Sequence, residues 1–139
     1  MSERHALRPP IDKYNGPYWQ GLRDGDLRVP KCMACGHLQV PMGPCCSNCL
    51  DDAFEWVALS GRGKIWSFIV YHHAFHPSLA DKLPYNVAEV LLEEGVKLLS
   101  NIVGIPNDEI RNDMSVRARF DRVDDELTLL RFEPDGPAA

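Results

Sequence analysis

Residues 32–49 read CMACGHLQVPMGPCCSNC, and this stretch decides how the rest of the chain is interpreted. It holds two Cys-x-x-Cys pairs, Cys32 with Cys35 and Cys46 with Cys49. Each pair can place two sulfurs on one side of a tight turn, and two such turns supply the tetrahedron of thiolates that Zn²⁺ prefers. Because a site closed by four thiolates has no open position for a substrate, the spacing predicts a structural Zn²⁺ site.

Two other residues near the pairs, Cys45 and His37, are less suitable as metal ligands. Cys45 is the odd sulfur, and we interpret it as a spare because Cys46 gives the better second turn. His37 is an alternative ligand, but four cysteines already close the site, so a strand histidine is the preferred interpretation. The same four cysteines permit iron and electron transfer, which ranks below zinc.

Composition and charge narrow the class of protein. The 139 residues are 45% hydrophobic and 25% charged, which is ordinary for a soluble globular chain. No stretch approaches the roughly 18 to 20 apolar residues of a membrane span, and the polar start has no signal region, so we expect a cytoplasmic protein. Acidic residues outnumber basic ones by 20 to 15, which argues against a protein whose main task is to bind a phosphate backbone.

The N-terminal part is predicted to be a disordered arm over residues 1–11, followed by a helical segment over residues 12–26. Asn15 can cap a helix that has Pro17 inside its first turn, and Gly25 would end it.

One face of this short helix is strongly apolar. Tyr18, Trp19 and Leu22 lie on it by their spacing, which is too much apolar surface to leave in water. Two alternatives remain open at this point. The aromatic residues pack on the chain's own metal module, or they dock on a partner protein.

The rest of the chain is predicted to be mainly β, with a zinc ribbon over residues 27–53 and a second domain over residues 54–134, before a disordered tail at 135–139. In the ribbon, a strand leads into the first cysteine pair and residues 37–40 form the return strand.

The second domain has the pattern of a small barrel. About five curved, alternating strands fit a five-stranded OB-fold, and a β-sandwich ranks second because it needs about seven strands. Gly61 and Gly63 predict a bend or bulge in the first long strand, and Glu93-Glu94-Gly95 predicts a hairpin turn.

The order of these parts resembles a family long catalogued as a domain of unknown function, in which a rubredoxin-like zinc ribbon precedes an OB-fold. The resemblance covers residues 12–134. It rests on the aromatic helix, both cysteine pairs, the arm with a proline between them, the glycines of the barrel, and the Pro-Tyr before the hairpin turn. The matching residues are Tyr18-Trp19, Cys32, Cys35-Gly36, Pro41, Cys46, Cys49, Gly61, Gly63, Pro84-Tyr85 and Glu94-Gly95.

This resemblance implies a function in acyl-CoA metabolism. Members are similar to accessory subunits that pair with thiolase-like enzymes, including lipid-transfer-protein-type aldolases, or with MaoC-like enoyl-CoA hydratases, as in steroid side-chain degradation. We therefore expect a non-catalytic subunit that organises such a complex, with acyl-CoA binding as an additional role suggested for the OB-fold.

The contact region for such a partner is predicted at the mouth of the barrel, in the loop over residues 74–84. The expected contact residues for a partner or ligand are the apolar and aromatic side chains Tyr18, Trp19, Phe75, Leu79, Leu83 and Tyr85. Arg117 and Arg119 share one strand face and are weak candidates for contacts with CoA phosphates.

No motif in the sequence predicts catalysis by this chain alone. His72, His73 and His76 lie together, but their spacing supplies no third group, so we interpret them as residues of the loop edge. The alternative function is a module that binds single-stranded nucleic acid, which OB-folds and zinc ribbons both serve. The acidic net charge of −5 disfavours it.

Overall fold

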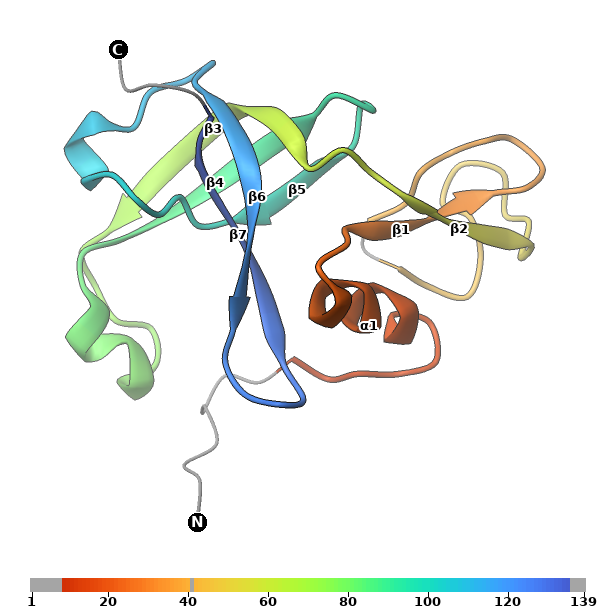
Figure 1. Ribbon diagram of the computed structural model, residues 1–139, viewed down its shortest axis with the longest axis horizontal. Coiled ribbons are helices and arrows are strands. Elements are labelled where there is room, and N and C mark those ends of the chain that lie inside the picture. Colours follow the sequence, from red (N-terminus) through yellow and green to blue (C-terminus); the bar gives the residue numbers. More distant parts are fainter. Residues whose placement is uncertain (1–8, 41, 136–139) are drawn as a thin grey trace.

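The computed structural model describes residues 9–40 and 42–135. The predicted disordered arm and tail therefore lie largely outside the described residues, as does Pro41. Figure 1 shows a two-stranded ribbon beside a larger curled sheet, with a helix near both. In chain order the elements are α1 (Gly16–Asp24), β1 (Arg28–Cys32), β2 (Phe54–Ala58), β3 (Arg62–Tyr71), η1 (Pro77–Lys82), β4 (Tyr85–Leu92), β5 (Lys97–Ser100), η2 (Asn107–Glu109), β6 (Ser115–Arg122) and β7 (Thr128–Pro134).

Helix α1 confirms the predicted helix, but its start is built differently. Asn15 occupies the N-cap position without capping a helical amide. Its Oδ1 accepts a hydrogen bond from the Asp12 amide (2.7 Å), and its Nδ2 donates to the Pro10 carbonyl (3.0 Å), so it stabilises the preceding turn. Gly25 ends the helix in the left-handed region, with φ 83°. Within the described residues, no helix is long and apolar enough to cross a lipid bilayer.

The ribbon pairs two strands that were predicted to lie in different domains. β1 pairs antiparallel with β2, whose residues were predicted to start the barrel. In the predicted return strand, Leu38 forms a single bridge with Lys31, and no regular strand is assigned over residues 37–40. An alternating pattern has the same period in a ribbon and in a barrel, so the sequence does not tell which sheet a strand joins.

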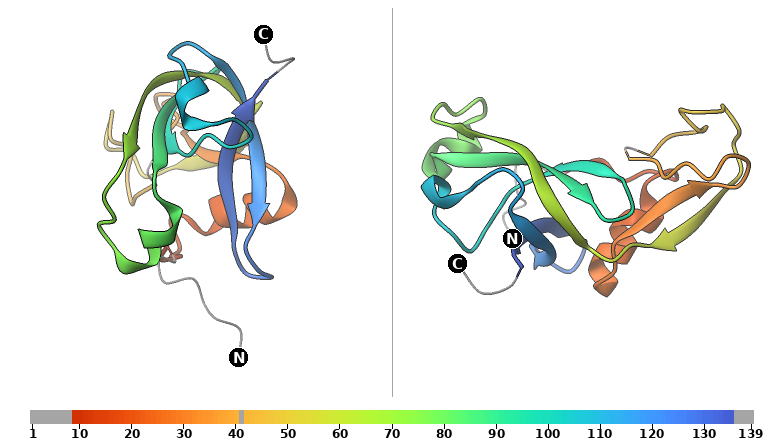
Figure 2. Two further views of the ribbon diagram at one scale, coloured as in Figure 1. Left: turned by 90° about the vertical axis from the view of Figure 1, so that its left-hand side faces the viewer. Right: turned by 90° about the horizontal axis from the view of Figure 1, so that it is seen from above.

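The predicted five-stranded sheet is confirmed, in the order β5-β4-β3-β6-β7 with antiparallel neighbours. Figure 2 shows how strongly this sheet curls. The chain after β5 closes the curl against β7, where Ile102 pairs with Phe132 in parallel. The Phe132 amide donates to the Asn101 carbonyl (3.0 Å), and the Val103 amide donates to the Phe132 carbonyl (2.8 Å). These contacts give the sheet its barrel shape.

The predicted bend in β3 is present, and Gly63 shows why glycine is needed there. A Cβ at this position would lie 2.4 Å from the Leu91 carbonyl oxygen, so a side chain would prevent β3 from approaching its antiparallel partner β4 this closely. The register between these strands then shifts between Ile65 and Ser67, which marks a β-bulge.

One apolar core joins the barrel to the N-terminal part of the chain. Leu22 of α1 packs in the same buried cluster as the inward side chains of the barrel. This packing fixes the start of the ribbon relative to the barrel. The fully buried members of the cluster include Leu22, Leu27, Val29, Ile65, Val90, Leu92, Val116 and Phe132.

Candidate metal centre and contact surfaces

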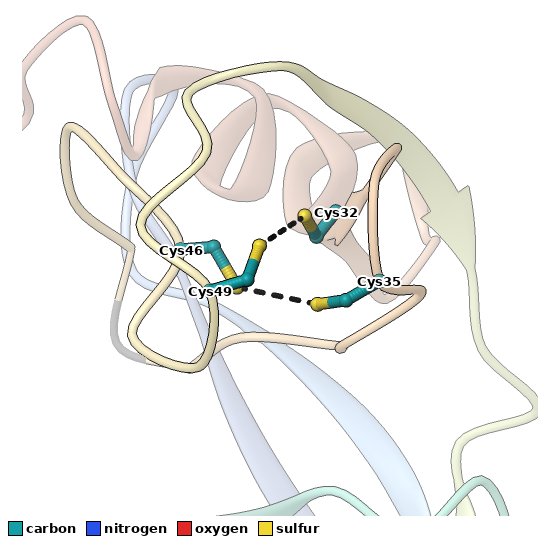
Figure 3. Close-up of side chains that lie close together, drawn as sticks. All are labelled: Cys32, Cys35, Cys46 and Cys49. Atoms are coloured by element: carbon teal, nitrogen blue, oxygen red, sulfur yellow. Dashed lines mark hydrogen bonds between the residues drawn. The ribbon is translucent and has the colours of Figure 1, made fainter.

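The four predicted cysteine ligands converge, and Figure 3 shows their sulfurs pointing toward one another. All four sulfurs lie within 4.8 Å of one another, with 3.5 Å between Cys32 and Cys49 and 3.7 Å between Cys35 and Cys46. A tetrahedral ion with metal–sulfur bonds of about 2.3 Å needs sulfurs about 3.8 Å apart. A disulfide needs about 2.05 Å. The arrangement therefore fits a four-coordinate metal.

Two backbone turns of the same design hold these sulfurs, and we call them the first and second knuckles (residues 32–36 and 46–50). The Gly36 amide donates to the Cys32 carbonyl, and the Leu50 amide donates to the Cys46 carbonyl, each at 2.9 Å. The last residue of each knuckle has positive φ, 79° at Gly36 and 69° at Leu50. The sequence predicts this conformation at Gly36 but not at Leu50, where no glycine marks it.

Asn48 supplies hydrogen bonds to two of the sulfurs. Its amide donates to Cys46 Sγ (3.3 Å), and its side-chain Nδ2 donates to Cys35 Sγ (3.5 Å). The Asn48 side chain, with the backbone of His37, lowers the pKa of Cys35 to about 6. Such donors stabilise a thiolate and orient it for a metal. The only signal in the sequence for this role of Asn48 was its position between two cysteines.

The pKa of Cys49 shifts in the opposite direction. A hydrogen bond from the backbone of Asp51 lowers its pKa, but contact with Cys32, desolvation and the other two sulfurs outweigh it and raise the pKa to about 12. Four thiolates this close repel one another, so they cannot all ionise without a compensating charge. A divalent cation bound by the four sulfurs would supply that charge.

Gln39 stabilises the second knuckle from the side. This buried side chain donates from Nε2 to the Cys45 carbonyl (3.0 Å) and accepts at Oε1 from the Ser47 amide (2.8 Å). Cys45 thus contributes its backbone here, and its sulfur is not part of the four-sulfur group. No sequence motif indicates this role of Gln39.

The predicted contact residues Phe75 and Tyr85 belong to an aromatic cluster at the ends of β3 and β4. Tyr71 stacks on Tyr85 with ring centroids 5.1 Å apart, and Phe75 packs edge-on against Tyr71 at 5.6 Å and against His73 at 4.9 Å. Phe75 is nevertheless 71% exposed. Figures 1 and 2 place the adjacent η1 at the end of the barrel away from the ribbon.

A cavity of about 680 Å³ adjoins this cluster between α1, η1 and β7, and we call it the α1–η1 cavity. The predicted contact residues Trp19, Leu79 and Tyr85 line it together. Tyr18 packs edge-on against Trp19 at 5.0 Å and lines a neighbouring cavity of about 300 Å³. Leu83 is half-buried at the end of η1 and is not among the described lining residues.

The remaining candidates do not converge on a reactive centre. Arg117 and Arg119 both approach Glu133, at 3.1 Å and 3.8 Å, on an exposed face of the barrel. His76 Nδ1 accepts a hydrogen bond from the Ser78 amide (3.1 Å), which caps η1. His72 and His73 are exposed.

Two family models match consecutive parts of the chain. Residues 19–55 match the model described as "ChsH2, rubredoxin-like zinc ribbon domain", and residues 56–121 match "ChsH2, C-terminal OB-fold domain". The chain is also 31% identical over 125 residues to a "DUF35 domain-containing scaffold protein" of Methanocaldococcus jannaschii, covering 88% of this chain and 86% of that protein. The chain belongs to the ChsH2 (DUF35) family. The boundary between the two ChsH2 matches lies inside β2.

Other similar proteins carry names of acyl-CoA enzymes or aldolases. A solved structure named "Ltp2-ChsH2(DUF35) aldolase" is 39% identical with a TM-score of 0.81, covering 91% of this chain and 98% of that one. A "Probable enoyl-CoA hydratase alpha subunit" of Thermomonospora curvata is 39% identical over 132 residues, covering 94% of this chain. The chain spans 40% of the length of that hydratase subunit. The resemblance inferred from the sequence is thus confirmed at the level of the family.

Proposed function

We propose that the chain is a non-catalytic accessory subunit that binds and organises an acyl-CoA-processing complex. The catalytic partner in this proposal is a thiolase-like or lipid-transfer-type aldolase, or a MaoC-like hydratase, and the pathway is the degradation of steroid or lipid side chains. The similarity of nearly the whole chain to the ChsH2 part of a solved aldolase carries the proposal.

The metal in this proposal is Zn²⁺ with a structural role. Four thiolates leave no coordination position for a substrate, so the ion holds the two knuckles together and the reaction takes place on the partner. Elemental analysis of freshly isolated protein is expected to give about one zinc per chain, as one ion per four ligands requires. A red protein with visible absorption would instead indicate iron.

The docking surface in this proposal is the aromatic cluster with the loop over residues 74–84. Phe75 is 71% exposed, and the outward face of β3 adds Ile69 and Trp66, each 53% exposed. Exposed apolar residues that adjoin one another are typical of surfaces that a partner covers.

Contacts with acyl-CoA form a finer part of the proposal. The guanidinium groups of Arg117 and Arg119 are exposed and share one carboxylate, so the charge of Glu133 does not neutralise both. These two groups are the proposed contacts for CoA phosphates. Exchanging both for Gln is expected to weaken binding of acyl-CoA to the assembled complex without changing assembly.

Co-expression with a candidate thiolase-like, aldolase or hydratase protein from the same organism tests assembly. Size-exclusion chromatography with light scattering at micromolar concentration is expected to give one peak that holds both proteins. Two separate peaks would contradict the proposal.

Surface variants locate the interface within that complex. Phe75→Asp places a charge in the aromatic cluster and is expected to abolish co-elution while the metal content stays unchanged. Met33→Asp is the matched control, because Met33 is 61% exposed and lies in the ribbon. Replacing residues 74–84 by a Gly-Ser linker should have the same effect as Phe75→Asp. Unchanged co-elution of both cluster variants would place the interface elsewhere.

A further inference from the structure

The α1–η1 cavity has a charge opposite to that of the chain as a whole. The chain carries a net charge of −5, yet no Asp or Glu is among the described residues that line the cavity. Lys82 and Arg131 line it, and its apolar walls include Leu79, Pro84 and Leu129. Its volume of about 680 Å³ lies in the range of small-molecule sites. The cavity therefore combines apolar walls with positive charge.

Arg131 has only part of its hydrogen-bonding capacity used by the contacts around it. One terminal nitrogen donates to Asn101 Oδ1 (2.6 Å), which is neutral. The nearest carboxylate is that of Asp121, which lies 4.0 Å from Nε of Arg131. The Asp121 side chain is 53% exposed. Burial lowers the pKa of Arg131, which means that its charge is poorly solvated. Since Lys82 already has an interaction within the chain, the argument rests on Arg131.

Trp19 adds a second donor at the same place. Its indole Nε1 is buried and has no hydrogen-bond partner among the described residues. Trp19 and Arg131 both line the α1–η1 cavity and the smaller cavity beside it. The nitrogen is out of contact with solvent, so an acceptor in the cavity would reach it only if the ring turned toward the cavity. Buried donors are nearly always satisfied, and an acceptor in this cavity would satisfy this one.

We propose that the α1–η1 cavity binds a monocarboxylate with an apolar body. The carboxylate accepts hydrogen bonds from the Arg131 guanidinium and, after the ring turns, from the Trp19 indole, while the apolar body packs on Leu79, Pro84 and Leu129. One partly buried guanidinium and one neutral donor suit a single negative charge better than a phosphate, which carries more. The inference concerns this chain alone, so it does not depend on the proposed partner.

Binding to the full chain tests this site without a partner. Isothermal titration with octanoate, octanol and octyl phosphate compares three head groups on the same apolar body. Octanoate is expected to bind at least about tenfold more tightly than octanol, since a charged hydrogen bond contributes roughly that factor. In NMR spectra, the indole proton signal of Trp19, assigned with the Trp19→Phe variant, is expected to shift downfield when octanoate is added. Octanoate and octanol binding equally would overturn the proposal, as would tighter binding of octyl phosphate.

Variants assign the binding to the two donors. Arg131→Gln is expected to reduce the affinity for octanoate by about tenfold or more and to leave octanol unaffected. Trp19→Phe keeps an aromatic wall and should cause a smaller loss. Arg122→Gln is the control. Arg122 lies on β6, is exposed, pairs with Asp125 and is not among the residues that line the cavity. Equal octanoate affinity in wild type and in a folded Arg131→Gln variant would contradict the site.

Discussion

The ribbon and the barrel are stabilised by different means. Ile65, Val90 and Phe132 inside the barrel are fully buried and come from three strands of one sheet. Among the described residues between 33 and 53, by contrast, the buried side chains are Gln39 and Cys46. The knuckles therefore have no apolar core of their own, and small modules of this kind depend on a metal. The comparison indicates that the knuckles need a metal ion to hold their shape, as the proposed function requires, while apolar burial shapes the barrel.

The largest effect is expected when one sulfur of the cluster is removed. Cys46→Ser deletes a buried ligand, and the apparent binding energy of structural zinc is of the order of 10–16 kcal/mol. Dialysis against a chelator followed by elemental analysis should leave little metal in this variant. Cys45→Ser, one residue away, should keep about one ion per chain. Equal metal retention by both variants would show that Cys46 is not a ligand.

A substitution that creates a cavity inside the barrel tests whether apolar burial stabilises it. Phe132→Ala removes a fully buried ring, and such changes cost about 3–5 kcal/mol of unfolding free energy. Leu99→Ala in the same sheet is expected to change it by less than about 0.5 kcal/mol, because Leu99 is 71% exposed. Urea unfolding measures both. Similar midpoints for the two variants would contradict the assignment of the core.

A smaller effect is expected where α1 packs beside the core. Burial raises the pKa of Tyr18 from 10.0 to about 12. Between these pH values the unfolded phenol ionises while the folded one keeps its proton, so stability is present below pH 10 and is lost as the pH rises to 12. The loss amounts to about 2–3 kcal/mol. Tyr18→Phe should reduce this alkaline loss in urea unfolding, and Tyr14→Phe, at an exposed position, should not. Parallel pH profiles of wild type and Tyr18→Phe would refute the shift.

The smallest effect is expected at the last residue of each knuckle, where the two knuckles differ in sequence. Leu50 has the positive φ that Gly36 adopts without strain, and its side chain is 75% exposed. Leu50→Gly is therefore expected to raise the unfolding free energy of the metal-loaded chain by up to about 1 kcal/mol. Leu50→Ala retains the Cβ and should give no such gain. A destabilised Leu50→Gly variant would mean that the strain at Leu50 is negligible.

The sequence predicts those parts of the molecule that depend on local spacing. The Cys-x-x-Cys pairs, the helix ended by Gly25 and the turn at Glu93-Glu94-Gly95 each follow from residues close together in the chain. The pairing of β1 with β2 joins residues far apart in the sequence, and alternation alone carries no information about the partner strand.

The supporting side chains of the site were harder to predict for the same reason. Gln39 and Arg131 have no motif, and their roles arise from contacts with Ser47 and Asn101 that only the folded chain creates. Trp19, Leu79 and Tyr85 were predicted as contact residues for a partner or ligand, and the fold brings them to one cavity.

Hydrogen exchange of the metal-loaded and the chelated chain tests most directly whether the ion shapes the knuckles alone. We expect the Gly36 and Leu50 amides, which close the two knuckles, to lose protection on chelation. The amides that join β3 to β4 are expected to keep theirs. Loss of protection throughout the barrel, or unchanged protection in the knuckles, would contradict the account.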